Sequence, residues 1–91
     1  MKKSLRLFLT GSLQPMFFNP YIKKEADALN VRGFVRLLDD KRVEVFIEGD
    51  SKAIEAMIPK CKQGPYNTKI HSVEQKDERF QDFKDFKVMS I

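Results

Sequence analysis

The sequence predicts an α/β sandwich in which two helices cover one face of a mainly antiparallel sheet. The first observation is the order of the residue patterns, which runs strand, helix, strand, strand, helix, strand and closes with one more extended segment. The second is that each helical pattern lies between two strand patterns, and right-handed crossovers then place both helices on the same face. With 42% hydrophobic residues, the 91-residue chain fits one domain over residues 1–91 with a single modest core.

The first strand and the first helix occupy residues 5–29. Leucines alternate with other residues from position 5 to position 9, which is the period of a half-buried strand. A loop follows over residues 11–19. We expect the helix to run from Pro20 to Leu29, because proline suits the first helical position and Asn19 suits the N-cap.

The middle of the chain predicts a hairpin and a second helix. Residues 33–38 and 43–47 are two strand patterns, and the turn signal at 39–41 indicates that they pair. The Gly-Asp-Ser group at 49–51 ends the second of these strands. It also caps a helix in which apolar residues recur at helical spacing between 53 and 61.

The last third of the chain begins at the Gly64-Pro65 break. Residues 69–74 predict a fourth strand, residues 75–79 a polar loop, and residues 83–88 a closing extended segment. The complete order is that of the ferredoxin-like sandwich, β-α-β-β-α-β with a closing strand. This architecture hosts many unrelated functions, so the function has to be argued from the site.

Composition and charge narrow the classes of function. The net charge is +4, but the lysines and arginines are scattered along the chain, so we expect no nucleic-acid partner. No segment approaches the roughly 18 apolar residues that span a bilayer, so we expect no membrane association. The lone Cys61 excludes an internal disulfide and suits a reducing cytosol, and we expect a cytoplasmic monomer. His71 has no partner at metal-ligand spacing, so we expect no metal and no cofactor.

The loop between the first strand and the first helix is the candidate functional site. A strand-to-helix loop aims backbone N–H groups at one point, so phosphate or another small anion is its candidate ligand. Asn19 is neutral where an enzyme would want a fixed cation, and Lys23 lies one helical turn further on. The candidate anion-binding residues are Gln14, Pro15, Met16, Phe17, Phe18, Asn19 and Lys23.

Two sequence blocks carry a resemblance to a known family. The loop reads G-S-L-Q-P-M-F-F-N over residues 11–19, and the second strand begins G-F-V-R-L over residues 33–37. These blocks resemble the acylphosphatase signatures G-x-V-Q-G-V-x-F-R and G-[WF]-V-x-N, and the spacing between them matches without a gap. Gly49, Gly64-Pro65 and the 85–88 run agree as well, so the resemblance covers essentially the whole chain. It implies a ferredoxin-like fold and hydrolysis of a carboxyl-phosphate bond without metal or cofactor.

The resemblance also implies roles for two positions. In the family, the signature arginine and the loop N–H groups hold the phosphate, and the asparagine of the second strand positions the attacking water. In this chain those positions are Asn19 and Leu37. Asparagine carries no charge, and leucine cannot orient a water. Pro15 replaces a signature glycine and removes an N–H donor. We therefore expect an acylphosphatase-like protein that lacks efficient acylphosphate hydrolysis.

Two alternatives stay open. The first is a weakly active acylphosphatase that binds phosphate through the N–H groups of residues 16–19 with help from Lys23. The second is an anion-binding, protein-interaction or regulatory module that keeps a weak anion site or pairs through a sheet edge. Arg36 could not replace the missing groups, because its side chain should face away from position 37.

Simpler structural interpretations apply to several of these residues. Asn19 is interpreted as a helix N-cap, Gln14 as a brace of the loop and Leu37 as sheet packing. Aromatic residues are interpreted as core packing; these are Phe17, Phe18, Phe80, Phe83 and Phe86. His71 is expected on the surface of a strand and Cys61 in the core as an inert thiol.

Overall fold

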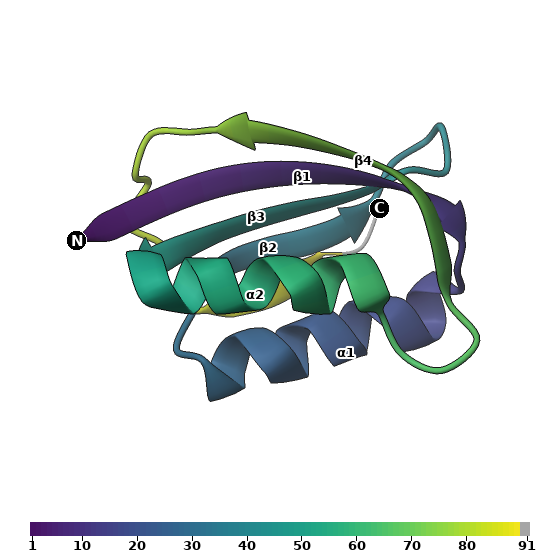
Figure 1. The fold of residues 1–91 in the computed structure, drawn as a ribbon, viewed down its shortest axis with the longest axis horizontal. Helices are drawn as coiled ribbons and strands as arrows, with labels where there is room; N and C mark the ends of the chain where they lie inside the picture. Colours follow the sequence, from purple (N-terminus) through teal and green to yellow (C-terminus); the bar gives the residue numbers. More distant parts are fainter. Residues whose placement is uncertain (90–91) are drawn as a thin grey trace.

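The computed structural model describes residues 1–89, which form a five-stranded sheet with two helices on one face (Figure 1). The elements are β1 (Lys2–Ser12), α1 (Pro15–Ala28), β2 (Arg32–Leu37), β3 (Val43–Asp50), α2 (Ser51–Gln63), β4 (Lys69–Asp77) and β5 (Phe86–Met89). The strand order is β4-β1-β3-β2-β5, and among residues 1–89 only the β2–β5 pair is parallel. This confirms the ferredoxin-like sandwich with its closing strand.

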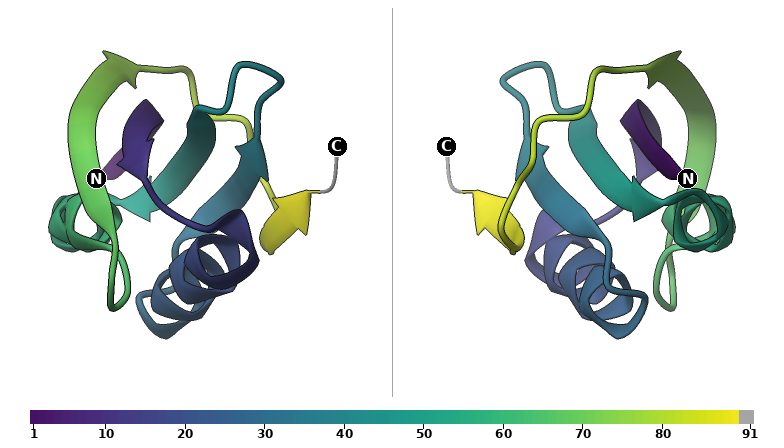
Figure 2. Two further views of the ribbon diagram at one scale, coloured as in Figure 1. Left: turned by 90° about the vertical axis from the view of Figure 1, so that its right-hand side faces the viewer. Right: turned by 90° about the vertical axis from the view of Figure 1, so that its left-hand side faces the viewer.

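The core lies between the sheet and the helices. The alternating leucines of β1 and the branched residues of β3 all point to this layer, and each is fully buried. As Figure 2 shows, α1 covers the β2–β5 side of the sheet and α2 the β1–β4 side. The helices contribute Phe18, Ile22 and Ala26 from α1, and Ile54, Met57 and Cys61 from α2.

The predicted hairpin is confirmed, since β2 and β3 pair antiparallel from Arg32↔Glu48 to Leu37↔Val43. Its close pairing depends on Gly33, whose φ is 138°. A Cβ at this position would lie 1.8 Å from the carbonyl oxygen of Phe46, so a side chain there would push the strands apart.

Helix α1 begins earlier than the sequence predicts. It starts at Pro15 with Gln14 as N-cap, so the expectations of a start at Pro20 and of an Asn19 N-cap are wrong. Pro15 suits the first helical position as well as Pro20 does. The earlier start also places Phe18 on the buried face, where it is fully enclosed. Packing against the core therefore outweighs the cost of Pro20 inside the helix.

Helix α2 has the predicted ends. The carboxylate of Asp50 accepts a hydrogen bond from the Lys52 N–H at 3.2 Å, which is a side-chain N-cap. At the other end Gly64 has a φ of 68°, and its N–H donates to the carbonyl of Lys60 at 3.0 Å.

Strand β4 is longer than predicted. Residues 75–77, expected as part of a polar loop, continue the strand and pair with Leu7, Arg6 and Leu5 of β1. Most β4 side chains are exposed, because the strand lies at the edge of the sheet. Residues 75–77 are held by backbone hydrogen bonds and do not alternate between apolar and polar, so the sequence pattern could not predict this part of the strand.

The segment after β4 crosses the face of the sheet that the helices leave uncovered, and it then forms β5 beside β2. Phe86 is buried in the core as expected. Phe83 instead packs on Phe34 and Phe46, with ring centroids 5.8 and 5.3 Å away. Phe80 is 40% exposed, so its interpretation as core packing is wrong.

Candidate functional site

The loop between β1 and α1 is tightened by its own backbone. The N–H groups of Phe17 and Phe18 both donate to the carbonyl of Gln14, at 2.9 and 2.8 Å. Pro15 supplies no N–H, and Asn19 lies inside the helix, where the N–H group bonds to a carbonyl four residues back. The helix therefore uses most of the donors that a loop in this position could aim at an anion.

The two phenylalanines of the loop, Phe17 and Phe18, have different environments. Phe18 is fully buried, as expected, but Phe17 is 61% exposed, so its interpretation as a core anchor is wrong. The neighbouring Met16 is 78% exposed. Gln14 braces the first turn through its main-chain carbonyl, and its side chain makes no capping hydrogen bond. The first turn of α1 thus presents apolar side chains outward.

Asn19 is the most unusual residue of the site. It is only 6% exposed, and its Oδ1 is buried without a hydrogen-bond partner among residues 1–89. Such an oxygen costs roughly 1–3 kcal/mol of desolvation that no bond offsets. Leu37, at the end of β2, packs against the core that α1 covers, which confirms its interpretation as sheet packing. Both side chains therefore lie on the helix-facing side of the sheet, and neither is charged.

The two cations considered as replacements for the missing charge, Lys23 and Arg36, bind elsewhere. Lys23 Nζ donates to Asp27 Oδ2 at 2.9 Å and to the carbonyl of Phe86 at 3.1 Å, so it leans toward β5. Arg36 donates to Glu44 on the opposite face of the sheet, which confirms that it faces away from position 37.

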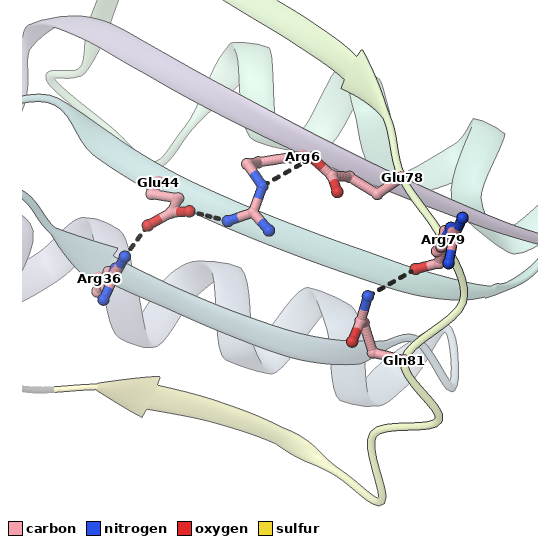
Figure 3. A network of polar contacts seen from close by, with 6 residues as sticks. All are labelled: Arg6, Arg36, Glu44, Glu78, Arg79 and Gln81. Carbon is pink, nitrogen blue, oxygen red and sulfur yellow. Dashed lines mark hydrogen bonds and ion pairs between the residues drawn. The ribbon is translucent and has the colours of Figure 1, made fainter.

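That opposite face carries a network of charged side chains (Figure 3). Glu44 is nearly fully buried between Arg6 and Arg36, and Arg6 Nε also donates to Glu78 at 2.9 Å. Partial burial lowers the pKa of Arg6, but its bonds to Glu78 and Glu44 outweigh this and leave the pKa above its usual value. The charges of Arg6 and Arg36 are therefore matched by carboxylates.

A second buried carboxylate, Glu48, holds the crossing segment. It is fully buried and accepts hydrogen bonds from the N–H groups of Gln81 and Phe83, at 2.7 and 2.6 Å, and from Ser4 Oγ at 3.3 Å. Sequence reasoning missed Glu44 and Glu48 because alternate glutamates on a strand are typical of an exposed face. The segment that buries Glu48 is more than 30 residues away along the chain.

The remaining candidate residues are not part of this site. Cys61 is buried as expected, and burial raises the pKa of its thiol to about 12. His71 is exposed on β4, also as expected. Within residues 1–89, no group of three or more histidine, cysteine, aspartate or glutamate side chains is arranged to hold a metal ion. Neither helix in this part of the chain is long and apolar enough to cross a membrane.

The sequence profile of the Acylphosphatase family matches residues 5–88. The acylphosphatase of Thermococcus kodakarensis is 37% identical over 89 residues, which cover 98% of this chain and 96% of the relative. That of Syntrophus aciditrophicus is 32% identical over 90 residues, covering 98% and 94%. The crystal structure of the Bacillus subtilis acylphosphatase superposes with a TM-score of 0.90 at 26% identity, covering 98% of this chain and 99% of that one.

Proposed function

This chain belongs to the acylphosphatase family, and from that premise we propose that it is an acylphosphatase-like protein without efficient acylphosphate hydrolysis. One observation carries the proposal. Asn19 and Leu37 occupy the positions at which the family signature has its phosphate-binding arginine and its water-positioning asparagine. The proposal covers this reaction only, and the scaffold is otherwise that of the family.

The charge at position 19 is the first support. A phosphoryl group is held best by a guanidinium that donates two parallel hydrogen bonds, and asparagine offers neither the charge nor the reach. Lys23 is the candidate to replace the missing arginine, but its Nζ already donates hydrogen bonds to Asp27 and to the carbonyl of Phe86. A lysine would in any case bind as a point charge.

The second support is the loss of polar groups around the reaction centre. Leu37 can neither accept a hydrogen bond from a water nor donate one to it, and it is partly buried against the core. Pro15 has no N–H, and the Phe17 and Phe18 N–H groups already donate to Gln14. Loss of one preorganised donor slows chemistry by roughly 10²–10³-fold. Several groups that serve one transition state do not contribute independently, so these factors should not be multiplied.

The direct test is hydrolysis of benzoyl phosphate by the purified protein. We expect a rate at or near that of the uncatalysed reaction. Turnover within about tenfold of the typical enzyme median of ~10 s⁻¹ would contradict the proposal. The relatives named acylphosphatase favour the alternative of a weakly active enzyme, which would show a slow rate that saturates with substrate.

A restoration experiment tests whether these two positions are the cause. The double variant Asn19→Arg/Leu37→Asn should gain measurable turnover, because it returns the bidentate cation and the amide together. The matched control is Asn19→Lys/Leu37→Asn, which restores a charge without the two-pronged geometry and should stay well below the arginine variant. Equal and measurable rates in the two variants would contradict this assignment. If both are inactive, adding Pro15→Gly tests whether the loop backbone is the deeper defect.

Retention of an anion site is a separate question. The alternative of an anion-binding or interaction module predicts that phosphate shifts the amide resonances of residues 16–19 in an NMR titration. The absence of any shift up to tens of millimolar phosphate would remove that alternative.

We place the protein in the cytoplasm, because a lone cysteine suits a reducing compartment.

A further inference from the structure

A small cavity lies beside the first turn of α1, and the sequence gives no sign of it. It encloses about 220 Å³ and is lined by Gln14, Phe17, Tyr66, Asn67 and Thr68. The first two come from the start of α1, and the other three come from the connection between α2 and β4. Residues about 50 positions apart in the sequence therefore build its two sides.

The two sides of the cavity are held in register by close packing. At Gly64, which ends α2 with a φ of 68°, an added Cβ would lie 2.7 Å from Thr68 Cγ2 and 3.2 Å from Phe18 Cε1. The lack of a side chain at Gly64 thus lets the α2–β4 connection pack against the first turn of α1. Asn67 adopts a φ of 65°, a left-handed conformation that asparagine tolerates well. The backbone that carries the two sides of the cavity is therefore held in place by packing.

The lining favours a particular kind of ligand. Phe17 and Tyr66 are 61% and 84% exposed, and both line this one cavity. Large aromatic side chains left open to solvent offer faces on which a flat ring can stack. The other three lining residues carry two amides and a hydroxyl, which can donate and accept hydrogen bonds without charge.

Size and charge narrow the ligand further. Pockets for drug-sized ligands enclose roughly 300–1,000 Å³, so this cavity fits one or two rings. In the part of the chain that the structure describes, no lysine, arginine, aspartate or glutamate lines it. A charged ligand would lose hydration on entering without gaining an ion pair.

We propose that the cavity is a binding site for an uncharged planar ring that carries an amide-like hydrogen-bonding edge. Phe17 and Tyr66 stack on the ring faces, and Gln14, Asn67 and Thr68 bond to its edge. This inference goes beyond the proposed function, because it requires neither an anion in the loop nor any hydrolysis. The outcome of the acylphosphate assay therefore leaves it unaffected.

Three small probes test the proposal by NMR titration of the full chain. Benzamide has the planar ring and the neutral amide, cyclohexanecarboxamide keeps the amide on a saturated ring, and benzoate keeps the ring with a charge. Benzamide should shift the backbone N–H signals of residues 14, 16, 17, 64 and 66–68 and the side-chain amides of Gln14 and Asn67, with saturation. It should bind at least tenfold more tightly than the other two probes.

Variants at the exposed aromatics complete the test. Phe17→Ala and Tyr66→Ala should each weaken benzamide binding at least tenfold, since each removes one stacking face. Both side chains are largely exposed, so the fold should persist, and the circular dichroism spectrum checks this. Phe80→Ala is the matched control, because Phe80 is also exposed but lines other cavities. Benzamide shifts that do not saturate by tens of millimolar, equal binding of the three probes, or full binding by both alanine variants would each overturn the proposal.

Discussion

At the scale of single residues, Asn19 links the stability of the protein to its proposed loss of activity. The residue lies inside α1, almost fully buried, and its Oδ1 has no hydrogen-bond partner among residues 1–89. In our proposal this position corresponds to the signature arginine. Asparagine here leaves a buried oxygen that has no hydrogen-bond partner among residues 1–89.

Replacement of Asn19 by leucine should therefore stabilise the protein. Leucine has the same branched arrangement of heavy atoms and no unpaired polar atom, so Asn19→Leu should raise the free energy of unfolding by about 1 kcal/mol. Urea unfolding followed by circular dichroism measures this change. Asn19→Asp is the opposing control and should destabilise the protein, because it places a charge in the same buried site. A loss of stability in Asn19→Leu would contradict this prediction.

At the scale of elements, the C-terminal segment depends most on side-chain contacts for its position in the fold. Strand β5 has only four residues and pairs with a single neighbour, β2. Charged side chains hold the segment that precedes β5 through hydrogen bonds to its backbone. Glu48 accepts hydrogen bonds from two N–H groups of this segment, and Arg32 donates to the carbonyl of Phe83 at 3.3 Å. Lys23 similarly joins α1 to the carbonyl of Phe86. These side-chain contacts help to hold the segment, because β5 forms fewer backbone pairs than the other strands.

Loss of charge at Glu48 should loosen this segment selectively. Glu48→Gln keeps the shape of the side chain but turns one acceptor into a donor, so it faces one of the two N–H groups unfavourably. We expect the free energy of unfolding to fall by about 2 kcal/mol. The amides of Gln81 and Phe83 should exchange hydrogen faster than the rest of the sheet. Glu55→Gln, on the exposed face of α2, is the matched control and should change neither quantity. Unchanged exchange at 81 and 83 would refute a fastening role for Glu48.

At the scale of the whole molecule, the sheet separates two different environments. The helix-facing side is an apolar core that includes the Cys61 thiol, and the opposite side combines the Arg6–Glu44–Arg36 network with packed phenylalanines. The buried carboxylates on the second side are ion-paired or hydrogen-bonded, whereas the thiol is surrounded by apolar groups. The thiol therefore lacks any partner that would stabilise its ionised form.

The buried Cys61 thiol should reduce stability at alkaline pH. Its pKa is about 12 in the folded protein against an ordinary value of 9.0, because the thiolate would lose hydration in the core. The unfolded chain therefore releases this proton at lower pH than the folded one. The contribution of the thiol is fully present below about pH 9, and it is lost as pH rises toward 12.

The measurement compares wild type with Cys61→Val, which fills a similar space and cannot ionise. The difference in their free energies of unfolding should be constant below pH 8. Above that pH the wild type should lose stability relative to Cys61→Val. Its slope should approach about 1.4 kcal/mol per pH unit, and urea titrations at pH 7.5–10.5 follow its onset. A difference that stays constant across this range would show that the thiolate is tolerated in the core.

The sequence by itself determined the architecture and the chemical character of two key positions. Alternation in β1 and β3, helical spacing in α2 and the caps at Asp50 and Gly64 all describe neighbours within one element. Local periodicity records which face of an element is apolar, so these features could be predicted. The absence of charge at Asn19 and of a polar group at Leu37 is likewise a property of the residues themselves.

Only the tertiary structure decided features that depend on contacts between distant segments. The start of α1 at Pro15 follows from the burial of Phe18 in the core, and the extension of β4 follows from backbone pairing with β1. The burial of Glu48 and the cavity beside Phe17 each require two segments more than 30 residues apart. A pattern within one element carries no record of what a distant segment will place over it, so these features appear only once the chain is folded.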